Sequence, residues 1–301
     1  MTDPIPPQAA QLIDLVLQAR PRDLGGGFMV GRVLPAPQRR LVGPFIFFDH
    51  MGPVDMPPGS GTDVRPHPHI GLATVTYLFD GELFHRDSLG FAQAIRPGDV
   101  NWMVAGRGIV HSERTAPELR RTGQFMHGIQ AWVALPLEQE ETEPGFFHHA
   151  ASTLPVIRRP GAELHLIAGS AFGEESPVRV SSPTFYLDAR FDEGASLPLP
   201  DEHEERAVYV VSGEVRIAGA TFGERSLLVL HPGASVSLES VRKSRVMLLG
   251  GAKLAGERHI DWNFVSSSPE RIERARREWK ERKFPLVPGD EVEFTPLPER
   301  K

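Results

Sequence analysis

The chain has 301 residues, with 33 Lys plus Arg, 39 Asp plus Glu and no cysteine, so its formal net charge is −6. The lack of cysteine excludes disulfide scaffolds, iron–sulfur clusters and thiol nucleophiles, and any bound metal needs nitrogen and oxygen ligands. A mildly acidic chain lacks the basic surface that grips nucleic-acid phosphates, so we expect no direct nucleic-acid partner. The length fits two domains or one large one.

The N-terminal residues 1–8 contain Asp3 and three prolines, with no basic region followed by an apolar run. No stretch reaches the roughly 18 apolar residues of a membrane span. We therefore expect no signal peptide and no membrane association. The expected location is the cytoplasm, or also the nucleus if the source is eukaryotic.

Apolar residues at helical spacing predict a helix over Ala9–Ala19. The glycines at 25–27 lack the Gly-Lys-Ser/Thr that follows a phosphate loop, and we expect a turn there. Short β-rich runs then dominate. Leu72–Phe79 and Glu82–Asp87 are separated by Asp-Gly, which is typical of a tight hairpin.

Further strands are predicted on both sides of an acidic segment at 138–144, and many short strands at close spacing indicate a sandwich or barrel. Near the C-terminus, Ser268 is a candidate N-cap and Pro269 a first helical residue. Ile272, Ala275 and Trp279 would share one face of that helix, which we expect to pack on the β-structure. The remaining predicted strands are 91–95, 100–105, 124–135, 185–189, 207–211, 214–217, 226–230 and 245–249.

The chain contains an internal repeat. The segment 75–82 aligns with 207–214, which places Tyr77 on Tyr209 at an offset of 132 residues. A Pro-Gly pair at 97–98 recurs at 232–233 with an offset of 135. Two copies of one β-unit follow from this match, with a boundary within 138–160. We therefore expect domains at 1–145 and 146–301, with the C-terminal helix in the second.

Two ligand pairs stand out among the twelve histidines. His67 and His69 are separated by one residue, as are His111 and Glu113, and residues i and i+2 of a strand point to the same face. Either pair alone is more often structural than ligating. Together, on facing strands, they could place three imidazoles and a carboxylate on one borderline first-row metal ion. Pro66 directly precedes His67 and has no backbone N–H, so we expect this segment at a strand start or a sheet edge.

Other histidines have plainer interpretations. His148 and His149 are expected in a solvated linker rather than on a metal. His203 and His231 are expected at the surface or in turns. His127 lies three residues from Gln130, so at most one of these side chains would face a barrel interior.

The second copy offers an internal test of the metal site. Shifting the four positions by the repeat offsets leads to Leu199, Asp201, Val246 and Leu248, and none of the histidines is kept. We therefore expect a metal-free second domain.

Three blocks of the N-terminal half resemble the pirin family, which is a bicupin family. They read PFIFFDHMGP (44–53), RPHPHIGLATVTYLFDGELFHRDSLG (65–90) and RPGDVNWMVAGRGIVHSE (96–113), and SSPERI (267–272) resembles the start of the family's C-terminal helix. The resemblance implies an all-β chain of two jelly-roll cupin barrels with short terminal helices. It places the metal ligands on His67, His69, His111 and Glu113, whereas Thr74 stands where many cupins carry a glutamate ligand.

The resemblance also implies quercetin 2,3-dioxygenase-type activity, in which a flavonol heterocycle is cleaved with O2. Glu113 would then also take the proton of the flavonol 3-hydroxyl as a general base. Iron is the expected metal, with copper, manganese, nickel, cobalt or zinc as alternatives. Because a free histidine titrates near 6.5, metal binding is expected to weaken below about pH 6.

Two other functions stay open. The family is also associated with non-catalytic roles, as a redox-sensing transcriptional co-regulator or a protein-binding regulator of a metabolic enzyme, and the charge of −6 favours a protein partner over DNA. A sugar-phosphate isomerase would need a basic pocket, for which Arg65, Arg86 and Arg107 are the nearest candidates. We expect a monomer.

Overall fold

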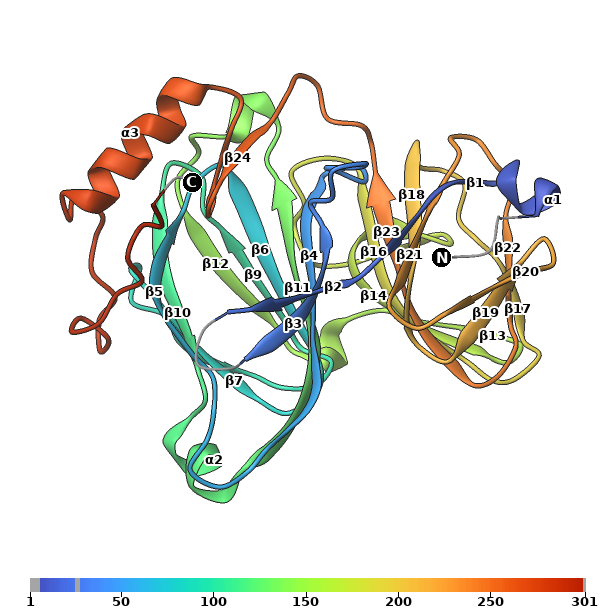
Figure 1. The fold of residues 1–301 in the computed structure, drawn as a ribbon, viewed down its shortest axis with the longest axis horizontal. Coiled ribbons are helices and arrows are strands. Elements are labelled where there is room, and N and C mark those ends of the chain that lie inside the picture. The colour runs from blue at the N-terminus through green and yellow to red at the C-terminus, as the bar shows by residue number, and fades with distance from the viewer. Residues whose placement is uncertain (1–5, 25–27, 300–301) are drawn as a thin grey trace. The chain divides into compact units, whose positions relative to one another are not determined.

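The computed structural model describes residues 6–24 and 28–299, so the turn expected at 25–27 lies outside the described part. Strands account for 51% of the structure, which confirms the all-β prediction. The described residues form three short α-helices, α1 (Pro7–Ala10), α2 (Pro117–Thr122) and α3 (Pro269–Lys280), and two 3-10 turns at Leu137–Gln139 and Ala151–Thr153. They divide into two compact units, each built mainly from β-strands (Figure 1).

The first unit, here called the first barrel, takes its described residues from 21–24, 28–31, 47–151 and 254–299. Two antiparallel sheets and one small hairpin build it. The four-stranded sheet has the order β5 (Asp63–His69), β10 (Ile109–Arg114), β7 (Leu83–Asp87) and β8 (Ala92–Ile95). The seven-stranded sheet has the order β12 (Gly145–His149), β9 (Val100–Val104), β6 (Leu72–Asp80), β11 (Gln124–Ala134), β4 (Phe45–Met56), β3 (Met29–Leu34) and β2 (Arg20–Asp23). The hairpin pairs β24 (His259–Asp261) with β25 (Phe264–Ser266).

The second barrel takes its described residues from 6–20, 32–46 and 152–253. Its larger sheet has the order β1 (Ile13–Gln18), β21 (Ser226–Leu230), β18 (Glu205–Ser212), β23 (Ser244–Gly251), β16 (Thr184–Phe191), β14 (Ala162–Ala171) and β13 (Val156–Arg159), with β15 (Glu174–Glu175) added to β14. Its smaller sheet has the order β17 (Ser196–Pro198), β22 (Ser237–Ser240), β19 (Glu214–Ile217) and β20 (Ala220–Gly223).

Apolar side chains fill the second barrel. Leu199, Val246 and Leu248, which the repeat aligns with ligand positions of the first barrel, all belong to its buried core. Side chains without a lone pair to offer therefore occupy three of the four corresponding positions.

The helix expected over Ala9–Ala19 is wrong. Only α1 is helical there, and β1 follows and pairs antiparallel with β21. Ile13 and Leu17 are both buried, and a spacing of four residues places two side chains on one face of a strand as well as of a helix. The apolar pattern could not distinguish the two, and pairing with β21 decides for the strand.

The tight hairpin at Asp80-Gly81 is also wrong, because the two flanking strands lie in different sheets. β6 pairs with β9 and β11, whereas β7 pairs with β8 and β10. Gly81 has a φ of +83°, and a Cβ atom there would meet the carbonyl oxygen of Phe125 at 2.6 Å. The glycine thus allows a close passage from one sheet to the other rather than a hairpin turn.

The compact units differ from the expected division at residues 145 and 146. β12 continues the first barrel by pairing with β9, and it carries His148 and His149, so these histidines lie on a strand and not in a linker. Helix α3 likewise belongs to the first barrel, while β1 belongs to the second. β1 and α3 thus each belong to the unit whose central segment lies farther from them in sequence, which sequence patterns do not reveal.

The C-terminal helix forms as predicted. The Ser268 hydroxyl oxygen accepts a hydrogen bond from the Arg271 backbone N–H, and Pro269 is the first helical residue. Ile272, Ala275 and Trp279 are buried and pack in one cluster of the first barrel, as the spacing indicated. In Figure 1 the helix lies beside the strands of that barrel.

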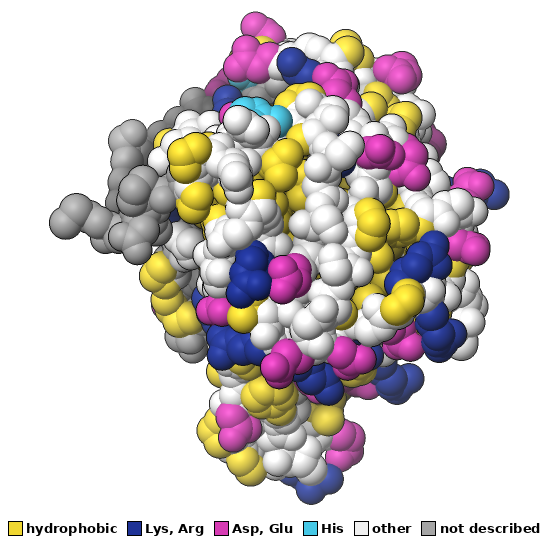
Figure 2. Space-filling view, turned by 90° about the vertical axis from the view of Figure 1, so that its right-hand side faces the viewer, with side chains coloured by type: hydrophobic (Ala, Val, Ile, Leu, Met, Phe, Trp, Pro, Cys, Tyr) yellow, Lys and Arg dark blue, Asp and Glu magenta, His cyan; other side chains and the backbone are white. Residues whose placement is uncertain are grey.

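Acidic and basic side chains are interspersed among apolar ones on the face of the molecule in Figure 2. This face carries no continuous basic stripe of the kind that follows a nucleic-acid backbone. Among the described residues, no helix combines the length and the apolar character needed to cross a membrane.

Candidate metal centre

Two neighbouring strands of the first barrel carry the four residues singled out in the sequence. β5 provides His67 and His69, and β10 provides His111 and Glu113. The strands pair antiparallel with His111 opposite His67. The i, i+2 spacing of each pair places its two side chains on one face of its strand, and the three histidines come together in the structure.

The three histidines form one buried cluster. One nitrogen atom from each of His67, His69 and His111 lies within 4.8 Å of the others. The Nε2 atoms of His69 and His111 are 3.1 Å apart, and the His67 and His111 ring centroids are 4.3 Å apart. Within the described part of the chain, no other group of at least three His, Asp or Glu side chains converges in this way.

Backbone carbonyls fix the tautomers of two rings. His67 Nδ1 lies 2.9 Å from the carbonyl oxygen of Arg65, and His69 Nδ1 lies 3.2 Å from that of Asn263. A carbonyl only accepts, so Nδ1 carries the proton in both rings and Nε2 carries the lone pair. His111 Nδ1 is buried without a hydrogen-bond partner among the described residues.

Burial keeps these imidazoles neutral. Desolvation lowers the pKa of His67 to about 4, although the hydrogen bond to Arg65 opposes this shift. Desolvation also lowers the pKa values of His69 and His111 well below their ordinary value, and charge repulsion from His67 adds to both shifts. Neutral imidazoles are the form that binds metal ions.

Glu113 lies beside the histidines but outside the 4.8 Å cluster. Its Oε1 accepts a hydrogen bond of 3.1 Å from the Thr76 hydroxyl, whose oxygen is also 2.7 Å from Gln130 Oε1. Burial raises the pKa of Glu113, and the charge of His85 and the Thr76 hydrogen bond oppose this rise. The carboxyl group is therefore more basic than an exposed glutamate.

A second pair of side chains, not identified from the sequence, lies beside the ligands. His85 Nε2 lies 2.9 Å from Asp87 Oδ2, and both side chains are buried. His85 pairs with Glu113 across β7 and β10, and its ring centroid is 5.4 Å from that of His111. The i, i+2 spacing on β7 is the same signal that revealed the ligands, so it could have identified this pair.

Aromatic side chains form another side of the site. The Trp132 ring makes an edge contact with His69 at a centroid distance of 5.0 Å and stacks on Phe47 at 3.9 Å. Phe146 stacks on His85 at 4.3 Å. Neither Trp132 nor Phe146 lies in a sequence motif that would have revealed its place beside the site.

The remaining histidines lie in other surroundings. His127 Nε2 is 2.7 Å from His50 Nε2, whereas the Gln130 side chain reaches Thr76 beside Glu113. His203, expected at the surface or in a turn, lies in a bend but is buried, and its Nε2 atom is 3.0 Å from the carbonyl oxygen of Ser170. Its ring stacks on Phe185, which explains the burial.

The donor set fits a metal ion. The Nε2 lone pairs of His67 and His69 and the ring of His111 converge in a buried place. Desolvation disfavours the protonated, charged forms of these rings. Imidazole nitrogens with a nearby carboxylate suit iron, copper, nickel, cobalt, manganese or zinc. The residues that would hold the ion are His67, His69 and His111, and Glu113 follows His111 by two residues on β10.

The family model described as Pirin matches residues 27–133 of the chain, and that of the Pirin C-terminal cupin domain matches residues 186–285. A Pirin-like protein of Caulobacter vibrioides is 51% identical over 291 residues, which cover 96% of this chain and 100% of that protein. A Pseudomonas aeruginosa protein provisionally named quercetin 2,3-dioxygenase is 41% identical over 87% of this chain and 82% of its own length. The crystal structure of a quercetin 2,3-dioxygenase from Acinetobacter baumannii superposes with a TM-score of 0.90 at 33% identity, covering 97% of each chain. The chain, with its two cupin domains, therefore belongs to the pirin family.

Proposed function

We propose that this protein is a metal-dependent dioxygenase of the quercetin 2,3-dioxygenase type, with iron as its metal and a flavonol and O2 as its substrates. The observation that carries the proposal is the cluster of three neutral, buried histidines next to a carboxyl group of raised pKa. The name of the Acinetobacter baumannii structure at 33% identity supports the choice of substrate.

Each side chain has a separate task in this proposal. His67, His69 and His111 hold the metal, with Glu113 as a fourth ligand that can leave the ion. When bound, the metal supplies redox chemistry with O2 and attracts the anionic oxygen of the substrate. Glu113 takes the proton of the flavonol 3-hydroxyl, and burial favours its protonated form after the transfer.

Polar and aromatic neighbours would prepare the site for a planar substrate. The Thr76 hydroxyl orients the Glu113 carboxylate through its 3.1 Å hydrogen bond. Trp132 and Phe146 present aromatic surface next to His69 and His85, and aromatic faces pack well against flat conjugated rings.

The test is aerobic incubation of the iron-loaded protein with quercetin, following the loss of its visible absorbance and the release of carbon monoxide. We expect turnover by the wild type, loss of turnover and of iron in His67→Ala, and loss of turnover in Glu113→Gln. The control His231→Ala removes an exposed histidine of the second barrel and should act as the wild type does.

A stoichiometrically loaded protein that cleaves no flavonol with iron, copper, manganese, nickel or cobalt would contradict the enzymatic proposal. The non-catalytic regulator would then be the better explanation. Glu113→Ala that keeps both full metal occupancy and flavonol cleavage would exclude the roles proposed for Glu113.

A further inference from the structure

The strand that carries His67 and His69 is an edge strand. β5 pairs with β10 on one side, and no described strand of its sheet lies on the other. Pro66 and Pro68 have no backbone N–H, so at these two residues the free edge of β5 offers carbonyl acceptors but no donors. The backbone N–H of Thr295, 229 residues beyond Pro66, donates a hydrogen bond of 2.8 Å to the Pro66 carbonyl oxygen.

The hydroxyl of Thr295 reaches the ligand itself through one atom. It donates a hydrogen bond of 3.1 Å to the carbonyl oxygen of Arg65, which also accepts the hydrogen bond of 2.9 Å from His67 Nδ1. Both donors therefore hold the same oxygen. Its position sets the direction of the Nδ1–H bond, and thereby the direction of the Nε2 lone pair on the opposite side of the ring.

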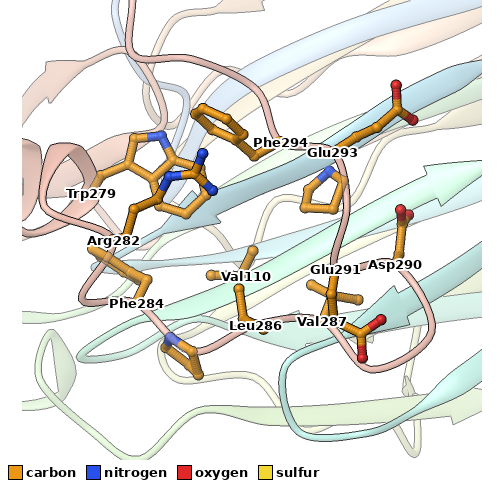
Figure 3. Close-up of a pocket in the computed structure, with 12 residues that line it drawn as sticks. Val110, Trp279, Arg282, Phe284, Leu286, Val287, Asp290, Glu291, Glu293 and Phe294 are labelled. Atoms are coloured by element: carbon orange, nitrogen blue, oxygen red, sulfur yellow. The ribbon is translucent and has the colours of Figure 1, made fainter.

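Thr295 is held in place by helix α3. The buried Trp279 donates a hydrogen bond of 3.0 Å from its indole Nε1 to the Thr295 carbonyl oxygen. Beside it, the Arg282 guanidinium lies 3.4 Å from the centroid of the Phe294 ring. Figure 3 shows Trp279, Arg282 and Phe294 gathered at one end of the cleft between residues 284–294 and the strands beneath them.

The same terminal segment, residues 284–299, here called the C-terminal strap, is anchored to the other ligand strand. Arg114, which directly follows Glu113 on β10, donates two hydrogen bonds of 2.7 and 2.8 Å to the Asp290 carboxylate and one of 2.9 Å to Glu293. In Figure 3 these two acidic residues lie at the end of the cleft away from Trp279. The strap therefore contacts both strands that carry ligands.

We propose that Thr295 is a positioning residue of the metal centre, whose hydroxyl orients His67 through the carbonyl oxygen of Arg65. The match to the family's C-terminal domain model ends at residue 285, so the strap lies almost wholly beyond it. The inference rests on the metal site of the proposed function but not on its substrate.

Cobalt(II) titration of the full-length protein tests the inference, with affinity and the visible d–d bands as readouts. Removing groups that orient metal ligands typically weakens metal binding about 10- to 100-fold. Thr295 is one hydrogen bond further from the ligand than the Arg65 carbonyl oxygen that it holds. We therefore expect Thr295→Val to weaken Co2+ binding about three- to tenfold and to shift the d–d bands. Thr295→Ser keeps the hydroxyl and should restore both readouts.

Two further variants separate positioning from folding. Thr122→Val removes an exposed threonine hydroxyl that bonds to the Glu118 carbonyl oxygen in α2, and it should bind Co2+ as the wild type does. Trp279→Phe removes the hydrogen bond that holds Thr295 and should change the d–d bands in the same direction as Thr295→Val. Circular dichroism of the metal-free variants verifies that each is folded.

Wild-type affinity and unchanged d–d bands in folded Thr295→Val would overturn the inference, as would a Thr295→Ser variant as impaired as Thr295→Val. Failure of the proposed metal site is seen separately, because the wild type itself would then bind no Co2+. Failure of the proposed substrate is separate again, since no flavonol is present in these titrations.

Discussion

The Nε2 atoms of His69 and His111 face one another at 3.1 Å inside the first barrel. Since His69 Nδ1 donates to the Asn263 carbonyl oxygen, the His69 Nε2 atom offers a lone pair to this contact. Protonating both rings would place two cations in a buried place, which is unfavourable. The two rings are therefore suited to share a metal ion, and they take up protons only at low pH.

Metal binding should persist to a lower pH than ordinary histidines allow. The ordinary histidine pKa near 6.5 predicts that metal binding weakens below about pH 6. Burial lowers the pKa of His67 to about 4 and those of His69 and His111 well below the ordinary value, so protons compete for the site only at lower pH. We expect Co2+ occupancy at about pH 5.5 to be close to that at pH 7, with loss near pH 4, measured by equilibrium dialysis. Half-occupancy near pH 6 at saturating metal would contradict this.

The stability of the metal-free protein should fall with acid over a related range. The pKa of His67 is near 6.5 in the unfolded chain and about 4 in the fold, so between these values the unfolded state binds more protons. The neutral His67 ring therefore costs the fold nothing above about pH 6.5, and the free energy of unfolding falls as the pH drops from there toward 4. All four tryptophans, at positions 102, 132, 262 and 279, lie in the first barrel, so tryptophan fluorescence reports its melting. We expect a shallower decline in His67→Gln, and parallel curves would refute the assignment.

Thr76→Val should raise the pKa of Glu113 further, because the Thr76 hydrogen bond opposes the rise that burial causes. We expect the acidic limb of the turnover profile to move to higher pH. Removing the hydroxyl should also destabilise the first barrel by about 1–2 kcal/mol, since the Glu113 carboxylate loses a donor. Thr122→Val removes an exposed threonine hydroxyl in α2, away from the site, and is the control, whose pH profile should match the wild type.

The ligand strands could be predicted from the sequence, but the contacts that support them could not. The spacing of His67, His69 and His111 is local, and strand geometry converts it directly into a shared face. Asn263 and Thr295, in contrast, reach the site from 194 residues beyond His69 and 230 beyond Arg65. The Asn263 contact uses a backbone carbonyl, which every residue type has, so its side chain carries no signal.

The passage of the chain from one sheet to the other could not be predicted from the sequence either. The chain bends at Gly81, but the Asp-Gly pair before β7 specifies only the local backbone direction and not the strand that follows. Whether the next strand pairs with β6 or enters the other sheet depends on non-local partners, here β10 and β8. The match between 75–82 and 207–214 succeeded because both barrels repeat the same crossing at Gly81 and Gly213, each with a positive φ.

Asp87→Ala should destabilise the first barrel strongly. The Asp87 side chain is fully buried, and its carboxylate accepts hydrogen bonds from the backbone N–H groups of Leu89 and Phe91 as well as contacting His85. Loss of three such interactions at about 1 kcal/mol each predicts a decrease of roughly 3 kcal/mol in the free energy of unfolding. Urea denaturation followed by tryptophan fluorescence measures it. Asp55→Ala, at an exposed position of β4, should change it by less than about 0.5 kcal/mol.

Glu140→Gln should release the hairpin β24–β25 from the first barrel. Glu140 is buried, forms a 2.7 Å ion pair with the buried Arg258, and accepts hydrogen bonds from the backbone and hydroxyl of Ser267. Removing one charge of a buried pair leaves the other uncompensated, which costs about 3–5 kcal/mol. Because Asn263, which bonds to His69, lies within this hairpin, we expect weaker Co2+ binding together with a lower urea midpoint. Glu138→Gln changes an exposed glutamate two residues away and should leave both unchanged. A Glu140→Gln variant that loses stability but keeps wild-type Co2+ affinity would show that the hairpin is not needed to orient His69.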